Sequence, residues 1–132
     1  MDFTLSPEIE DVRLRTRRFV EAHVLPLEAN PGGYDDHENI RLDVLRAVQA
    51  KAKAEGLWAP QAPKDFGGMG LPIVGWAVMY EEANRSIFGP LAFNCAAPDD
   101  GNMNLLARAG TPARRTNGSS PLSRARCVPP SP

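Results

Sequence analysis

Apolar side chains recur every three to four positions along most of this chain, and nowhere do they alternate as they would in a strand. Such spacing lines up one apolar stripe along a helix. The clearest case covers residues 7–24, with Ser6 as a capping residue and Pro7 at the first helical position. Pro26 is expected to end this helix. Its apolar stripe contains Ile9, Val12, Thr16, Phe19, Val20 and Val24. The pattern predicts an all-α fold, a small helical bundle.

Three further helices are expected at residues 40–55, 72–85 and 99–108. Gly56 falls where the end of the second helix would need a left-handed residue. The third segment, 72–85, is apolar on nearly all sides over its first two turns. Such a helix is typical of the middle of a bundle, so we expect it to be surrounded by the others.

Between the second and third helices, the stretch "PKDFGGMGLP" places two prolines and three glycines in ten positions. Glycines permit positive φ and close backbone approach, and prolines stiffen the entry and exit. We therefore expect a structural hinge, formed by Pro63, Gly67, Gly68 and Gly70. A phosphate cradle is the alternative, but it needs GxGxxG after a strand or GxxxxGK[ST], and "GGMG" is neither.

Charge and cysteine content exclude several classes of protein. The chain has 15 Lys plus Arg against 16 Asp plus Glu, so neither nucleic acid nor a membrane surface is expected as a partner. No run approaches 18 apolar residues, and the N-terminus lacks the pattern of a signal peptide. Cys95 and Cys127 are too few for a disulfide framework, and His23 and His37 lack metal-ligand spacing, so no metal is expected. These features predict a cytoplasmic protein.

Several other side chains could suggest a site, but each has a simpler explanation. Glu81 and Glu82 point about 100° apart on a helix, which favours a solvated or salt-bridged face over acid–base work. The arginines within residues 13–18 could grip phosphates, but their acidic neighbours favour a solvated face. Cys95 lies in a small apolar run, typical of a buried, inert thiol. The larger aromatic residues are expected in the core: Trp58, Trp76, Phe66, Phe88 and Phe93.

Four stretches, in this order, resemble one known family: "FTLSPE", "GLWAPQAPKDFGGMGLP", "YEEANRS" and "GPLAFNCAAPDDGNMNLLARAGTP". Residues 1–113 are similar to the N-terminal helical domain of the acyl-CoA dehydrogenases, most of all to the branch that includes members 10 and 11. Each stretch alone is a weak signal, and their order and spacing make the resemblance specific.

The resemblance implies an FAD-dependent enzyme that dehydrogenates acyl-CoA thioesters between the α and β carbons. Its FAD lies mainly against a middle β domain and a C-terminal helical bundle, and its catalytic glutamate comes from that bundle. This chain would then contain no catalytic and no cofactor-binding residue, would not hold FAD tightly and would be inactive alone. It would supply one wall of the acyl-chain pocket, near Phe93, Asn94 and Ala97, and part of the packing of a homo-oligomer.

From Arg114 the chain becomes rich in serine, proline and arginine, without periodicity. We expect residues 114–132 to be disordered. Family members continue past "GTPA" with a segment like "QKDEWLKPLVEG…RSAFA", and synonymous codons for this tail, read two bases further on, can spell that continuation. Our hypothesis is a frameshift near Ala113, which the nucleotide sequence would test.

Two other functions remain open alongside an enzyme fragment. One is a small helical interaction module, which would dock onto full-length family subunits or present its arginines to an acidic partner. The other is a non-functional remnant. The sequence does not name the length of the acyl chain or the electron acceptor.

Overall fold

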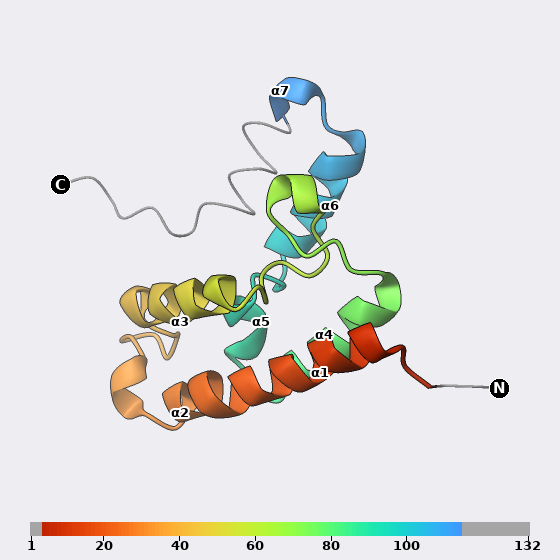
Figure 1. Ribbon diagram of the computed structural model, residues 1–132. Helices are drawn as coiled ribbons and strands as arrows, with labels where there is room; N and C mark the ends of the chain where they lie inside the picture. Colours follow the sequence, from red (N-terminus) through yellow and green to blue (C-terminus); the bar gives the residue numbers. More distant parts are fainter. Residues whose placement is uncertain (1–3, 115–132) are drawn as a thin grey trace.

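The computed structural model describes residues 4–114, which form helices joined by loops, without a strand in this range (Figure 1). The all-α prediction is confirmed. The elements are α1 (Pro7–Phe19), η1 (Val20–Val24), α2 (Leu25–Glu28), η2 (Pro31–Gly33), α3 (Leu42–Ala54), η3 (Lys64–Phe66), α4 (Ile73–Ala83), α5 (Gly89–Ala92), α6 (Asp99–Ala109) and α7 (Pro112–Arg114). None of these helices is both long and apolar enough to cross a membrane.

The first helix begins as its sequence predicts and ends later. Ser6 Oγ accepts a hydrogen bond from the Ile9 N–H at 3.4 Å, and a proline occupies the first turn. The prediction that Pro26 ends the helix is wrong, because the chain continues through η1, a π-helical turn, into α2. Pro26 has no N–H, and its ring would collide with a carbonyl one α-turn back. The wider π turn, in which the Leu25 N–H bonds to Val20 O, accommodates the proline.

Helices α1 and α4 lie side by side and run in the same direction (Figure 1). The Ile9 side chain lies against Gly75 near their starts, and Arg85 pairs with Glu21 beyond their ends. Helix α3 packs against the short helix α5, which the sequence analysis did not predict. Together these pairs enclose one core, whose largest fully buried apolar side chains are Phe19, Val20, Val24, Leu57, Met79 and Phe93.

The expectation that residues 72–85 lie in the middle of the bundle is wrong for their first turn. Ile73 is 74% exposed and Val74 53% exposed. Helix α4 packs mainly against α1 and also contacts the short helix α5, and neither covers these two side chains. Deeper in α4, Val78, Met79 and Ala83 are buried as expected.

The segment between α3 and α4 folds back on itself through backbone hydrogen bonds. The N–H of Met69 donates to Ala59 O at 3.2 Å, and the N–H of Leu71 donates to Pro60 O at 3.1 Å. A third bond, from Ala59 N to Phe93 O at 2.8 Å, ties this segment to the end of α5. Gly56 starts the segment with φ +69°, as predicted for the left-handed residue that follows α3. The segment therefore forms a compact loop, which lines the larger of the two cavities described below.

The tail predicted to be disordered lies, from residue 115 onward, outside the described residues. That expectation, the domain boundary at residue 113 and the frameshift hypothesis stay predictions.

Candidate functional site

The three residues expected at an acyl-chain wall lie just after α5, but they differ in exposure. Phe93 is fully buried, with its ring centroid 5.2 Å from that of Phe19. Asn94 is also buried and takes a left-handed backbone conformation, with φ +55°. Ala97 is exposed. The chain thus turns sharply at Asn94 and emerges from the core within three residues.

Two buried glutamines hold this turn in place. Gln49, on α3, donates from Nε2 to Leu91 O at 2.9 Å, and Gln61 donates from Nε2 to Asn94 O at 3.2 Å. The Oε1 atoms of both glutamines are buried and have no protein partner. Gln49 falls on the buried side of α3, and Gln61 lies in the loop that follows, where sequence reasoning did not single it out. For Gln49, the available signal was a polar side chain at a position that the helical periodicity buries, because a buried polar side chain needs a hydrogen-bond partner.

A cavity of about 140 Å³ separates this turn from α3. It brings Asn94 and Ala97 together with Gln49, while Phe93 is not among its lining residues. The other lining residues are Leu45, Leu91, Ala96, Pro98 and Asp99. Most of these lining residues are apolar, and two carboxamides and the carboxylate of Asp99 supply its polar part, so the cavity offers mainly apolar contact.

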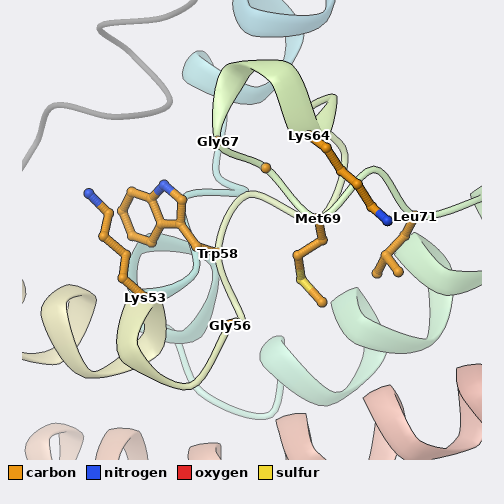
Figure 2. A pocket seen from close by; sticks show the side chains of 8 residues that line it. Lys53, Gly56, Trp58, Lys64, Gly67, Met69 and Leu71 are labelled. Atoms are coloured by element: carbon orange, nitrogen blue, oxygen red, sulfur yellow. The ribbon is translucent and has the colours of Figure 1, made fainter.

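A larger groove, of about 550 Å³, lies on the other side of the loop that follows α3 (Figure 2). Gly67 and Gly68 line it, whereas Pro63 and Gly70 lie beside it in the same loop. Its remaining lining residues are Lys53, Gly56, Trp58, Lys64, Met69 and Leu71.

The amide groups of the loop glycines are used inside the loop. The Gly67 N–H donates to Lys64 O at 2.9 Å, the Gly68 N–H to Pro63 O at 3.1 Å and the Gly70 N–H to Ala62 O at 2.9 Å. A phosphate cradle needs such amides to point at the ligand. The glycine loop therefore does not fit the diphosphate of FAD, and the alternative of a phosphate site has no glycine amides to use.

Glu82 lies at the centre of a cluster of arginines that the sequence placed on a solvated face. It is only 3% exposed, and Arg17 Nη2 and Arg13 Nη1 lie 2.7 Å and 3.1 Å from its Oε1. Burial raises the pKa of Glu82, but hydrogen bonds from Arg17 and Arg13 outweigh it and hold that pKa below its usual range. Glu81 is exposed. The sequence predicted a solvated or salt-bridged face for Glu81 and Glu82. The salt-bridged alternative is correct for Glu82, and its cluster with the arginines has a structural role.

Cys95 is buried, and burial together with the negative charge of Asp100 raises its pKa to about 12. The predicted burial of Cys95 is therefore confirmed, and its inertness stays a prediction. His23 lies edge-on to the Phe19 ring, and His37 is exposed in the loop before α3. Among the described residues no group of histidine, cysteine and carboxylate side chains is arranged to hold a metal ion.

Comparison with known proteins gives one consistent result. Residues 6–123 match the family described as "Acyl-CoA dehydrogenase, N-terminal domain". The chain is 32% identical over 128 residues to "Acyl-CoA dehydrogenase family member 11" of Rattus norvegicus, covering 92% of this chain and 16% of the relative. It is 33% identical over 130 residues to "Probable acyl-CoA dehydrogenase FadE2" of Mycobacterium tuberculosis, covering 92% of this chain and 30% of that protein.

A solved structure agrees with the sequence matches. The chain described as "Structure of a putative acyl-CoA dehydrogenase from Mycobacterium abscessus" superposes with a TM-score of 0.75 at 30% identity, over 91% of this chain and 32% of the solved one. This protein thus spans less than a third of each of these three relatives. Its sequence and its fold show that the chain belongs to the acyl-CoA dehydrogenase family, within which it matches the N-terminal domain.

Proposed function

We propose that this chain acts as the N-terminal helical domain of an FAD-dependent acyl-CoA dehydrogenase, an enzyme that forms a double bond between the α and β carbons of an acyl-CoA thioester. The observation that carries the proposal is the structural match to the solved M. abscessus relative, with a TM-score of 0.75 over 91% of this chain. We assign the flavin and the catalytic base to parts of the enzyme outside this chain, as the family resemblance implies. The glycine loop supports this for the flavin, because its glycine amides are bonded within the loop and do not face a diphosphate.

Within that enzyme, Phe93, Asn94 and Ala97 form part of the acyl-chain wall. The cavity lined by Asn94 and Ala97 supports this assignment, because it is bounded mostly by apolar side chains. Phe93 backs the wall from the core, and Gln49 and Gln61 fix the turn between them through the bonds to Leu91 O and Asn94 O. An acyl chain would then meet a rigid surface.

The glycine loop has a structural role in this proposal. Pro63 is extended at its start, and Gly67 and Gly70 take φ of +84° and +60°. A Cβ on Gly68 would lie 2.2 Å from Ala62 O, so only glycine fits there. The loop joins α3 to α4 and fixes their separation.

We also propose that this domain contributes to the packing of a homo-oligomeric enzyme. Exposed apolar side chains support this role. Ile73, Val74 and Leu105 are more than half exposed. The same side chains also suit the second candidate function, a helical module that docks onto full-length family subunits. Mixing the chain with a full-length relative and measuring the mass of the products distinguishes the two, because a docking module forms a defined complex.

The first test is to purify the chain with added FAD and record flavin absorbance after gel filtration. Colourless protein with a helical circular dichroism spectrum is expected. Flavin retained in a one-to-one ratio, and bleached by an acyl-CoA, would contradict the proposal that other parts of the enzyme hold the flavin.

The acyl-wall assignment is tested in a chimera that joins residues 1–113 to the remainder of the M. tuberculosis relative. Ala97→Trp should shift the preference of the chimera toward shorter acyl-CoA substrates, because the indole would fill space beside the wall. Ala109→Trp is the matched control, since Ala109 is exposed at the end of α6 and does not line the cavity. Equal substrate profiles for the two variants would show that Ala97 is not part of the acyl-chain wall.

A further inference from the structure

A second groove runs between α3 and the continuous helix formed by α1, η1 and α2. Figure 1 shows that α1 and α3 run in opposite directions. At one end of the groove Arg15 donates from Nη2 to Glu55 O, and His23 Nε2 lies 3.9 Å from Glu55 Oε1. At the other end Leu27 lines a cavity together with Asp43, at the start of α3. The two helices therefore flank the groove over about 18 Å of helix, from Arg15 to Leu27.

Two cavities make up this inter-helix groove, one of about 400 Å³ and one of about 320 Å³. His23 lines both, so the cavities adjoin there. Phe19 and Val48 are buried and belong to the floor, whereas Ala22 and Ala47 are exposed, one on each wall. Two alanines at these positions leave room for the larger side chains of a partner. The apolar lining residues are Phe19, Ala22, Leu27, Val44, Ala47 and Val48.

The two acidic residues that line the groove have basic neighbours. Arg41 Nη2 lies 2.7 Å from the Oδ2 atom of Asp43. Glu55 lines the same cavity as Arg15 and His23, and both of these side chains approach it. The carboxylates of the groove are thus already placed beside cationic or protonatable groups of this chain.

The basic residues Arg18 and Lys51 have no such neighbours. Both line the groove and are exposed, and their side chains form no hydrogen bond or ion pair with another described residue. The arginines of α1 are therefore divided, because Arg13 and Arg17 contact Glu82 on α4 whereas Arg18 faces the groove. The charges left for a partner are positive, which is complementary to a partner with carboxylates.

The walls of the groove favour a helix over an extended peptide as its occupant. Both walls are helical, so their backbone groups are used within the helices and offer no strand edge to pair with. A third helix needs only side-chain contacts, and its apolar stripe would pack into the space between the two walls.

We propose that this inter-helix groove binds an acidic amphipathic helix of a partner protein, with its apolar stripe between Ala22 and Ala47 and its carboxylates beside Arg18 and Lys51. The groove shares no lining residue with the cavity at Asn94 and Ala97 and does not depend on the function proposed above. Burial of apolar surface favours the complex, and the paired charges select an acidic partner.

The test titrates the full ¹⁵N-labelled chain with a synthetic peptide of about 14 residues, which has leucines along one helical face and glutamates on both sides of it. A hydrocarbon staple on its outer face keeps the peptide helical before binding. Saturable shifts are expected in the amides of Ala22, Ala47 and Lys51. The same peptide with lysines in place of glutamates should bind about tenfold or more weakly. Equal affinity for the two peptides would overturn the proposal.

Reversal of the two unpartnered charges provides the second arm. Arg18→Glu with Lys51→Glu should weaken binding of the acidic peptide about tenfold or more and strengthen binding of the lysine peptide. Lys64→Glu with Arg114→Glu is the matched control, since both residues are exposed outside the groove and the change in net charge is the same. Equal effects of the two double variants would overturn the assignment of Arg18 and Lys51.

The apolar contact is tested separately. Ala22→Gln with Ala47→Gln should weaken binding of the acidic peptide about tenfold, because the longer side chains occupy the space meant for the leucines. Ala50→Gln with Ala54→Gln is the control, since both alanines are exposed on α3 and do not line the groove. Circular dichroism verifies that all variants are folded. Unchanged affinity of the first double variant would overturn the placement of the apolar stripe.

The remaining outcomes identify a different occupant. Shifts confined to Ile73 and Val74 would show adsorption to exposed apolar side chains and would overturn the proposal. Self-association of the chain alone that is abolished by Arg18→Glu with Lys51→Glu would assign the groove to a second copy, and would overturn the acidic partner helix. None of these results changes the acyl-wall proposal, which is decided by the substrate profile of the chimera.

Discussion

Glu82 is the only buried carboxylate among the described residues, and its burial depends on the arginines that surround it. Arg13 and Arg17 are 23% and 44% exposed, so water still reaches the positive side of the cluster. The arrangement joins the second half of α1 to the last turn of α4. Removing the negative partner takes away the carboxylate that Arg17 contacts, whereas Arg13 keeps its ion pair with Glu10.

Glu82→Gln should therefore lower the free energy of unfolding by about 2 kcal/mol, less than for a fully buried pair because both arginines are partly solvated. Urea unfolding followed by circular dichroism measures the change. Glu81→Gln is the control on the same helix, and as an exposed change it should stay within about 0.5 kcal/mol. Similar losses for both variants would show that the cluster contributes little.

The same cluster predicts a pH dependence. The folded-state pKa of Glu82 is lowered, so its contribution is fully present above the unfolded pKa of about 4.3 and is lost as pH falls through the lower folded value. The stability difference between the native chain and Glu82→Gln should therefore be constant from pH 7 to about 5 and shrink below about 4. A difference that stays constant down to pH 3 would contradict this assignment.

Two glycines with opposite surroundings provide a matched pair. At Gly68 an added Cβ would meet Ala62 O at 2.2 Å and Ala59 O at 2.6 Å, while at Gly101, inside α6, it would meet nothing within 4 Å. Gly68→Ala should destabilise the chain by about 3 kcal/mol through overpacking. Gly101→Ala should stabilise it by about 0.5–1 kcal/mol through helix propensity. Thermal or urea unfolding of both variants measures the contrast, and equal effects would exclude the close approach at Gly68.

Within the helices, the start of α1 depends on a single side-chain cap. Ser6→Ala removes the acceptor for the Ile9 N–H and should cost about 0.5–1 kcal/mol, near the low end for caps because the bond is 3.4 Å long. Ser6→Asp keeps an acceptor and should retain stability close to that of the native chain. Chemical denaturation of the three proteins tests this, and a neutral Ser6→Ala would mean that solvent satisfies the amide equally well.

The ends of the helices show which sequence signals depend only on neighbouring residues. Ser6, Pro7 and Gly56 act through neighbouring backbone groups, so the sequence predicted their roles correctly. Pro26 did not end its helix, because the π turn of η1 keeps Val20 and Val24 in the core while the proline is accommodated. The choice between ending and widening a helix depends on what the next turn packs against.

At the scale of the whole molecule, the exposed apolar side chains at the start of α4 are expected to promote self-association. Ile73→Ser with Val74→Ser should reduce concentration-dependent self-association without loss of stability, because both side chains are more than half exposed. Sedimentation velocity over a range of concentrations measures this. Leu42→Ser, on α3, is the control for an exposed apolar residue elsewhere, and an equal effect there would mean that association is nonspecific.

Helical class, four of the helical segments and the expected burial of Cys95 follow from residues close together in the chain, because periodicity and capping act over a few positions. The family, too, could be suggested from ordered motifs. The partners of Glu82, the hydrogen bonds from Gln49 and Gln61 to the turn at Asn94, and the exposure of Ile73 required the folded structure. Each depends on which distant segments meet, and the apolar pattern of a helix does not tell whether a neighbour covers it. Tertiary packing alone brings Gln61 within hydrogen-bonding distance of Asn94, and packing likewise leaves one face of α4 uncovered.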